Sequence, residues 1–164
     1  MEIRKIQIED AKNLLNLLKK LDAETTFLLY EKDERNSTIE QQRKNIQEHL
    51  EKESLTFVLE DNKKLVGYVF GNIFTANRKK HCMNLAIAIL QEYTGKGYGT
   101  KLMKTIEEYG INNGITRLEL EVAKTNKVAI SLYQKTGFEE EGIKRNAFLV
   151  NGKYEDELLM AKII

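Results

Sequence analysis

Residues 84–100 read NLAIAILQEYTGKGYGT, and this stretch decides how the rest of the chain is interpreted. Its apolar run, residues 85–90, is long enough for a buried strand and too short to span a membrane. A polar break follows, then the glycine run GKGYG at 95–99, and then a helical pattern over 101–109. A strand, a glycine loop and a helix start predict a phosphate site, because the first amides of a helix lack internal partners and its dipole favours an anion.

The glycine spacing excludes two common phosphate loops. The glycines follow the pattern G-x-G-x-G, whereas a dinucleotide-binding fold requires G-x-G-x-x-G and an acidic residue after a second strand. A P-loop requires G-x-x-x-x-G-K-[ST], which this stretch does not contain. The loop therefore predicts an anion site of another kind, and an ordinary strand–helix connection with spare glycines is the alternative.

Composition limits the classes of function. The chain has 164 residues, which suits a single domain over residues 1–164, and its 41% hydrophobic and 31% charged content is typical of a globular protein. The net charge of +1 provides no general attraction to nucleic acid or to an anionic membrane, so we expect neither as a partner. The single cysteine, Cys82, excludes an intrachain disulfide, and the first ten residues contain no apolar signal-peptide core. We therefore expect a cytoplasmic protein.

Before the glycine loop, the patterns predict two helices and four strands. Leu14, Leu15, Leu18 and Leu21 recur at helical spacing in an amphipathic helix over 10–22, and a capping box at 37–41 begins a polar helix that reaches about residue 50. Alternating apolar residues predict strands at 2–7, 55–60, 65–76 and 81–90, with bulges at Gly67 and Gly71.

After the loop, residues 117–122 alternate strictly and predict a strand parallel to 81–90, because a helix connects the two. Asn126 is expected to cap a short helix that ends at Gly137. Strands at 139–149 and 154–163 are expected to form a hairpin around Asn151-Gly152, a strong signal for a type I′ turn.

Two motifs in this order resemble the GNAT family of acetyl-CoA-dependent N-acetyltransferases. The first is the glycine loop TGKGYG at 94–99, where the family usually has Arg/Gln-x-x-Gly-x-Gly/Ala, so Thr94 stands in place of Arg or Gln. The second is Asn126-x-x-Ala129-x-x-Leu132-Tyr133-x-x-x-Gly137-Phe138, and the stretch 154–162 also resembles bacterial members. The resemblance covers essentially the whole chain.

The resemblance implies an α/β fold (α+β mixed). It would be a single GNAT-like domain with a mixed, mostly antiparallel sheet of about seven strands, about four helices and splayed central parallel strands. It also implies acetyl-CoA as co-substrate, with its pyrophosphate on the amides of 95–100 and its pantetheine arm along the end of the 81–90 strand. No metal is implied. The expected cofactor-binding residues are Ile89, Leu90, Thr94, Gly95, Lys96, Gly97, Tyr98, Gly99, Thr100, Asn126, Ala129 and Tyr133.

The implied reaction is direct attack of a primary amine on the acetyl thioester. An alkyl ammonium has a pKa of about 10 and must lose a proton before it attacks. By resemblance, the Leu90 amide would donate to the oxyanion, and Tyr133 would protonate the leaving thiolate as general acid, although core packing also explains this tyrosine.

The general base is the least determined role. Family members often have a glutamate on the strand before the glycine loop, where this chain has Asn84. Glu119 and Glu121, on one face of the next strand, are candidate bases, and Glu24 and His81 are alternatives. Ordinary solvated or paired charges explain these residues equally well.

The resemblance implies that the acceptor is a primary amine of a small molecule or peptide. Glu24, Thr25, Phe27 and Tyr30, in the irregular connector after the first helix, are candidate acceptor-site residues, and a plain surface connector is the alternative. Two other functions stay open: a catalytically idle acyl-CoA-binding module, favoured by Asn84, and a protein N-terminal acetyltransferase. A homodimer also stays open.

Overall fold

The computed structural model describes residues 1–51 and 54–164. Within these residues the chain forms seven strands, four α-helices and two short 3-10 helices. In chain order they are β1 (Glu2–Lys5), η1 (Ile8–Asp10), α1 (Ala11–Glu24), α2 (Ile39–Glu51), β2 (Leu55–Asp61), β3 (Lys64–Ile73), β4 (Cys82–Ile89), η2 (Gln91–Tyr93), α3 (Tyr98–Asn112), β5 (Arg117–Ala123), α4 (Lys127–Lys135), β6 (Glu139–Val150) and β7 (Lys153–Ile163).

The strands follow the order β1-β2-β3-β4-β5-β7-β6 in one mixed sheet. β4 and β5 run parallel, with Cys82–Asn84 in register with Arg117–Glu119. The pairs β1–β2, β2–β3, β5–β7 and β6–β7 are antiparallel. This arrangement confirms the predicted fold class, including the parallel pair.

The chain forms two compact units, which are described separately. Unit 1 comprises Met1–Asn72 and Ala86–Ile106, and unit 2 comprises Ile73–Leu85 and Glu107–Ile164. Unit 1 therefore contains α1, α2, the first three strands up to Asn72, the end of β4, the glycine loop and the start of α3. Unit 2 contains the start of β4, the end of α3 and the elements from β5 to β7.

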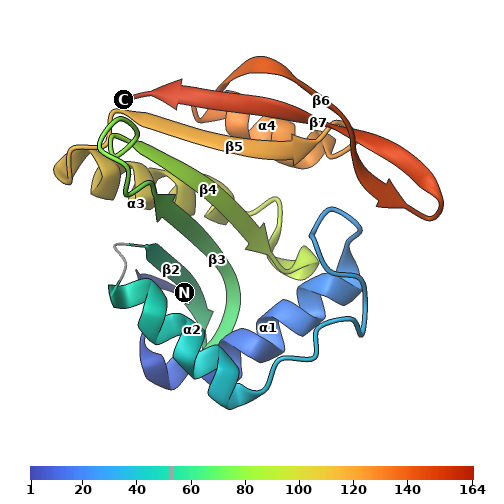
Figure 1. Cartoon of the computed structure of the whole chain (residues 1–164). Coiled ribbons are helices and arrows are strands. Elements are labelled where there is room, and N and C mark those ends of the chain that lie inside the picture. The colour runs from blue at the N-terminus through green and yellow to red at the C-terminus, as the bar shows by residue number, and fades with distance from the viewer. Residues whose placement is uncertain (52–53) are drawn as a thin grey trace. The chain divides into compact units, whose positions relative to one another are not determined.

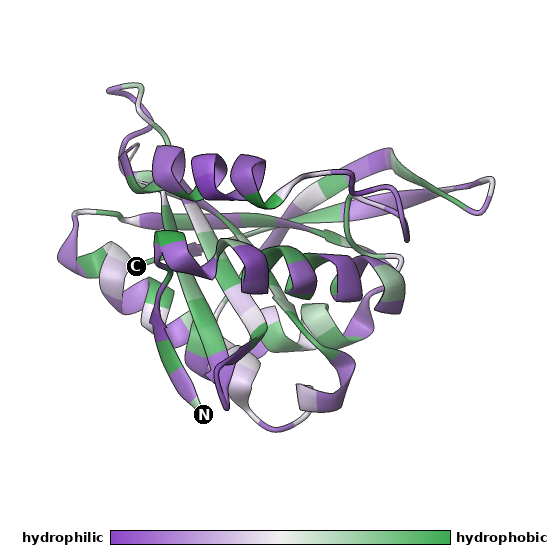
Figure 2. Ribbon diagram, turned by 90° about the horizontal axis from the view of Figure 1, so that it is seen from below, coloured by the Kyte–Doolittle hydropathy of each residue, from purple (hydrophilic) through white to green (hydrophobic). Residues whose placement is uncertain are grey.

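In unit 1, α1 and α2 lie side by side (Figure 1). The buried residues of α1 include Leu14, Leu15 and Leu21, as the helical spacing predicts, but Leu17 is buried whereas Leu18 is only half-buried. Leu18 is less buried because it lines a cavity, described below. The helices carry hydrophilic faces interrupted by hydrophobic bands, the pattern of amphipathic helices packed on a core (Figure 2).

A charged cluster fastens β1 to the start of α1 and to β2. The Arg4 guanidinium donates to both carboxylate oxygens of Asp10, at 2.7 and 2.8 Å, and to Glu60 Oε2. Asp10 also accepts from the Gln7 amide at 2.8 Å. The hydrogen bonds from Arg4 hold the pKa of the Asp10 carboxyl below its usual range, with burial acting in the opposite sense.

The capping box before α2 is confirmed. The Thr38 amide donates to Gln41 Oε1 at 2.7 Å, and the Gln41 amide donates to Thr38 Oγ1 at 3.2 Å. The predicted bulge at Gly67 is also confirmed, because Leu59 pairs with Gly67 while Glu60 pairs with Leu65. The bulge predicted at Gly71 is wrong, since this residue pairs regularly with Leu55.

In unit 2, β7 lies between β5 and β6, so the C-terminal hairpin joins the sheet through its second strand (Figure 1). Asn151 and Gly152 have φ of 50° and 76°, which confirms the predicted I′ turn. Leu118 of β5 and Met160 of β7 are almost fully buried. A Cβ added at Gly110 of α3 would lie 3.1 Å from Met83 Cε, so a small residue allows the helix to approach β4.

Candidate functional site

The glycine loop adopts backbone conformations that favour glycine. After β4, the short η2 turns the chain, and Gly95 and Gly97 have φ of 71° and 81°. A side chain at these angles is strained even though nothing lies within 4 Å of an added Cβ at either position. Glycine is therefore required by the backbone path and not by neighbouring protein atoms.

The loop leaves a row of backbone donors unused. The Lys101 amide donates to the Gly97 carbonyl at 3.2 Å and marks the beginning of hydrogen bonding in α3. Within the described residues, no acceptor is found for the amides of 95–100, which precede it. These amides lie at the positive end of the α3 dipole, so the loop has the properties of an anion site.

Two contacts hold the start of the loop in place. The Gln91 amide donates to Glu24 Oε2 of α1 at 2.9 Å. The Tyr93 hydroxyl donates to Asp61 Oδ2, at the end of β2, at 3.0 Å, and this bond raises the pKa of Tyr93. Side chains from two other elements of unit 1 therefore fix η2.

Thr94, which replaces the usual arginine or glutamine, acts within the turn. Its hydroxyl donates to the Gln91 carbonyl at 2.8 Å. Positive charge is nevertheless present beside the loop: Lys96 Nζ lies 5.5 Å from the ring centroid of Tyr93, and Lys101 Nζ lies 5.7 Å from that of Tyr98.

The backbone at the end of β4 is hydrogen-bonded to β3. The Leu90 amide, predicted as the donor to the oxyanion, donates to the Val66 carbonyl of β3 at 2.9 Å. This amide therefore already has an acceptor in the sheet, and its role as donor to the oxyanion stays a prediction. Ile89 lies against β3, where a Cβ at Gly67 would come within 2.9 Å of its Cγ1.

The second motif lies in unit 2. Asn126 Oδ1 accepts from the Ala129 amide at 3.2 Å, which confirms the predicted cap of α4, and Gly137 has the positive φ of 91° expected after the helix. Tyr133 is 5% exposed and its ring packs beside Phe138, with centroids 5.9 Å apart. Packing therefore accounts for the ring of Tyr133, while its proposed acid role concerns the hydroxyl.

The candidate bases on β5 are both ion-paired. Glu119 accepts from Arg117 at 2.9 Å and lies 3.6 Å from Lys79 Nζ. Glu121 accepts from Lys144 at 2.7 Å. Burial, and then the charge of Glu121, raise the pKa of the neighbouring Glu157 carboxyl. These contacts give Glu119 and Glu121 structural roles within unit 2.

The connector after α1 is tied down by a buried ion pair. Arg35 Nε lies 2.6 Å from Asp22 Oδ2, and the Asp22 side chain is 1% exposed. The Arg35 guanidinium also lies 4.4 Å from the ring centroid of Tyr30. Thr25 Oγ1 accepts from the Phe27 amide at 3.2 Å, while Phe27 and Tyr30 remain 39% exposed. Of the four predicted acceptor-site residues, Glu24 is the one whose side chain forms a hydrogen bond, within the described residues, to the η2 turn that precedes the glycine loop.

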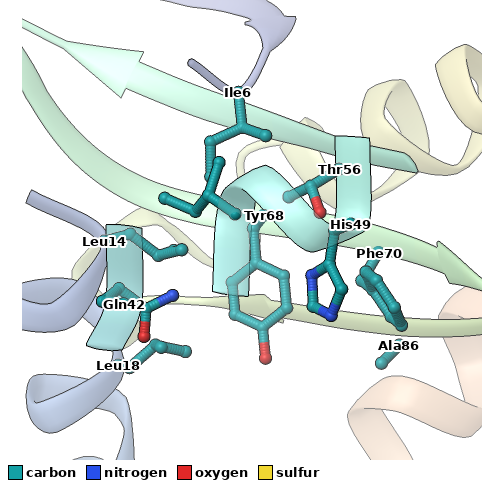
Figure 3. A pocket seen from close by; sticks show the side chains of 10 residues that line it. Ile6, Leu14, Leu18, Gln42, His49, Thr56, Tyr68, Phe70 and Ala86 are labelled. Atoms are coloured by element: carbon teal, nitrogen blue, oxygen red, sulfur yellow. The ribbon is translucent and has the colours of Figure 1, made fainter. Parts of the chain in front are cut away.

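Unit 1 also contains a cavity that the sequence reading missed. Its volume is about 190 Å³, and it lies among α1, α2, β2, β3 and β4 (Figure 3). Apolar side chains form most of its wall: Ile6, Leu14, Leu18, Ile46, Phe70 and Ala86. Its polar lining consists of Gln42, His49, Thr56 and Tyr68, and the His49 and Phe70 rings lie side by side with centroids 5.2 Å apart. No local motif marks these residues, because they come from separate elements.

The sequence profile of the acetyltransferase (GNAT) family matches residues 15–138, which include the glycine loop and the second motif. The chain belongs to this family. The solved structure of a GNAT-family acetyltransferase from Streptococcus pneumoniae is 30% identical, covers 99% of both chains and superposes with a TM-score of 0.94.

Curated relatives of this GNAT chain carry different acceptor names. A spermidine N(1)-acetyltransferase of Escherichia coli is 33% identical over 105 residues, which cover 63% of this chain and 55% of that enzyme. A ribosomal-protein-alanine N-acetyltransferase of the same species is 35% identical over 75 residues, covering 46% of this chain and 51% of that enzyme. The chain thus spans about half the length of these relatives, and the family alone does not select an acceptor.

The described residues show neither a metal site nor a membrane-spanning helix. They contain no group of three or more His, Cys, Asp or Glu side chains placed to hold a metal ion. None of the helices found in residues 1–51 and 54–164 combines the length and apolar character needed to cross a bilayer.

Proposed function

We propose that this GNAT chain is an acetyl-CoA-dependent N-acetyltransferase that acts on a primary amine of a small molecule or peptide. The observation that carries the proposal is the row of unused amides over 95–100 at the start of α3. These donors, with positive φ at Gly95 and Gly97, have the chemistry that binding of a pyrophosphate requires, which supports the proposal. A cytoplasmic location stays a prediction.

Acetyl-CoA supplies an activated acetyl thioester. Residues of the glycine loop, from Thr94 to Thr100, would hold its pyrophosphate, and Ile89 and the adjacent backbone of β4 would hold its pantetheine arm. Asn126, Ala129 and Tyr133 are the residues proposed for contact from α4. The charges of Lys96 and Lys101 lie beside the loop and would attract the phosphates.

The acceptor amine must lose a proton when its nitrogen forms the bond to the acetyl carbon and the carbon–sulfur bond breaks. We propose Glu24 as the residue that receives this proton and passes it to water. Its carboxylate is exposed and already reaches the Gln91 amide, directly after β4, whereas Glu119 and Glu121 are engaged in ion pairs. Tyr133 is proposed to give a proton to the leaving thiolate.

Release of free thiol from acetyl-CoA, measured across amino acids, amino acid amides, polyamines, aminoglycosides and N-terminal peptides, tests the proposal. Amine-dependent release is expected, and Glu24→Gln should lower kcat about 100-fold or more, in the range of general-base catalysis. Glu9→Gln changes an exposed glutamate outside the loop and is the matched control. Thiol release that Glu24→Gln leaves unchanged would remove Glu24 from the mechanism.

A catalytically idle acyl-CoA-binding module is the second candidate. The observation that favours it is that the chain has Asn84 on β4 while both glutamates of β5 are ion-paired. Calorimetric binding of acetyl-CoA without thiol release on any amine of the panel would establish this candidate in place of the enzyme.

A further inference from the structure

The cavity in unit 1 contains polar groups that have no partner within the described residues. Gln42 and Thr56 are each 8% exposed, yet their side chains form no hydrogen bond there, and the Tyr68 hydroxyl also forms none. No fully inaccessible side-chain nitrogen or oxygen among the described residues lacks a partner, so these groups reach open space. Because buried polar groups in native proteins are normally satisfied by protein atoms, water or a ligand, a molecule that enters the cavity can form hydrogen bonds with them.

The cavity is otherwise apolar and contains no carboxylate. None of the ten described residues that line it is acidic, and the buried Asp22 of α1 is already bound to Arg35. A cationic group inside this wall would lose its hydration without gaining an ion-pair partner. A polyamine, which carries a second and often a third positive charge, is therefore a poor fit.

The cavity follows the face of β3 and β4 that leads to the glycine loop. β3 and β4 are neighbours, and the Leu90 amide donates to the Val66 carbonyl at the loop end of this pair. Tyr68 and Phe70 of β3 and Ala86 of β4 line the cavity on this face. Ala86 and Leu90 are four residues apart along the strand, which corresponds to about 13 Å. A small amine that extends from the cavity and a thioester arm that extends from the loop can together span this distance.

Helix α1 contacts both the cavity and the start of the glycine loop. It lines the cavity through Leu14 and Leu18, and its last residue, Glu24, contacts the Gln91 amide at the start of the loop. An acceptor whose apolar part occupies the cavity would therefore direct its amine toward the end of α1, where the Glu24 carboxylate accepts from the Gln91 amide.

We propose that this cavity binds the apolar body of the acceptor, and that the acceptors are amines with a compact aliphatic or aromatic body and an adjacent neutral hydrogen-bonding group. The N-terminal end of a peptide with an apolar first residue, or the corresponding amino acid amide, has this chemistry. The volume of about 190 Å³ is near that of six water molecules at about 30 Å³ each, which suits one such side chain. The inference rests on the proposed N-acetyltransferase function, whose acceptor it specifies.

The test compares kcat/KM for leucinamide, glycinamide, lysinamide and spermidine. The three amides share the same α-amine, so their differences report the side chain alone. We expect leucinamide to exceed glycinamide at least tenfold, as an apolar side chain in a fitting pocket does, and to exceed lysinamide and spermidine as well. Spermidine or lysinamide as the better substrate would overturn the inference and leave the proposed function intact.

The variant Ala86→Leu tests whether the preference for leucinamide arises in the cavity. Ala86 is exposed to the cavity, and a larger side chain there should lower kcat/KM for leucinamide about tenfold while changing that for glycinamide little. Ala76→Leu makes the same change in an exposed turn of unit 2 and should alter neither. Leu18→Phe, from the opposite wall, is the second variant if Ala86→Leu does not fold. An equal loss for both amides in both variants would contradict the inference.

A binding measurement separates the two proposals. If no amine releases thiol, the proposed function fails, and the inference is decided by chemical-shift changes in the protein on addition of leucinamide. Shifts that are produced by leucinamide, weaker with glycinamide and abolished in Ala86→Leu would support the cavity as an apolar-amine site. The absence of such shifts would overturn it.

Discussion

The glycine loop and the cavity both belong to unit 1 and share β4, but they differ in what makes each a site. The loop is contiguous in sequence and presents backbone amides over 95–100. The cavity is assembled from side chains on five elements, and its wall is mostly apolar. Recognition of a ligand by backbone amides requires glycine at defined positions, and these glycines are visible in the sequence. Recognition of a ligand by the shape of a cavity requires only residues that are common in any protein core. The class of cofactor can therefore be predicted from the sequence, whereas the acceptor cannot.

The largest expected effect is a loss of acetyl-CoA affinity, from a substitution that disrupts the glycine loop and leaves the cavity unchanged. Gly97→Val forces a β-branched residue to a φ of 81°, at a cost of about 2–3 kcal/mol, unless the loop changes its path. We expect acetyl-CoA affinity to fall at least about 30-fold in calorimetry, with binding of leucinamide unchanged.

Gly114→Val is the matched control. Gly114 has a similar φ of 76° and likewise no atom within 4 Å of an added Cβ, but it follows the end of α3. It should lower the melting temperature as Gly97→Val does and leave acetyl-CoA affinity unchanged. Equal affinity in the wild type and Gly97→Val would mean that the pyrophosphate lies elsewhere.

The second-largest expected effect is a loss of stability that should affect the glycine loop and the cavity equally. Asp10→Asn removes the carboxylate that accepts two hydrogen bonds from Arg4, and we expect a loss of about 2 kcal/mol in the free energy of unfolding, in the range of charged hydrogen bonds. Because the folded pKa of Asp10 is lowered, this stability is present above the unfolded pKa of about 3.9 and is lost as pH falls through the folded pKa.

Urea unfolding of the wild type and Asp10→Asn between pH 2 and 7 checks this expectation. The two curves of stability against pH should converge at the acid end. A difference that stays constant below pH 4 would show that the carboxylate charge is not the source of the stabilisation.

The sequence was sufficient for the features that depend on local chemistry. The capping box at Thr38 and Gln41, the cap at Asn126 and the I′ turn at Asn151 were all found where their residue types predict them. Contacts between distant segments were not readable: the Leu90 amide is occupied by Val66, far away in the chain, and no spacing indicates this bond. Nor does the alternation of β5 reveal that its glutamates meet Arg117 and Lys144.

A smaller effect sharpens the role of the cavity. Thr56→Val replaces a hydroxyl without a described partner by a methyl group of nearly the same shape. We expect KM for leucinamide to rise about fivefold, the value of one hydrogen bond of about 1 kcal/mol, while the free energy of unfolding stays equal or increases. Thr105→Val, on the exposed side of α3, is the control for the substitution itself. An unchanged KM would exclude Thr56 from acceptor binding.

The smallest effect concerns Thr94, the residue by which the loop departs from its family. Thr94→Arg adds a charge beside the proposed pyrophosphate but removes the hydroxyl bond to the Gln91 carbonyl. An exposed ion pair contributes about 0.5 kcal/mol, so acetyl-CoA affinity should rise about twofold at low salt, and the gain should vanish at high salt through screening. Thr94→Gln removes the hydroxyl without adding charge, so it isolates the cost of the lost bond. If Thr94→Arg and Thr94→Gln bind acetyl-CoA equally at low salt, charge at this position has no role, and the amides of 95–100 with the neighbouring lysines suffice for the anion.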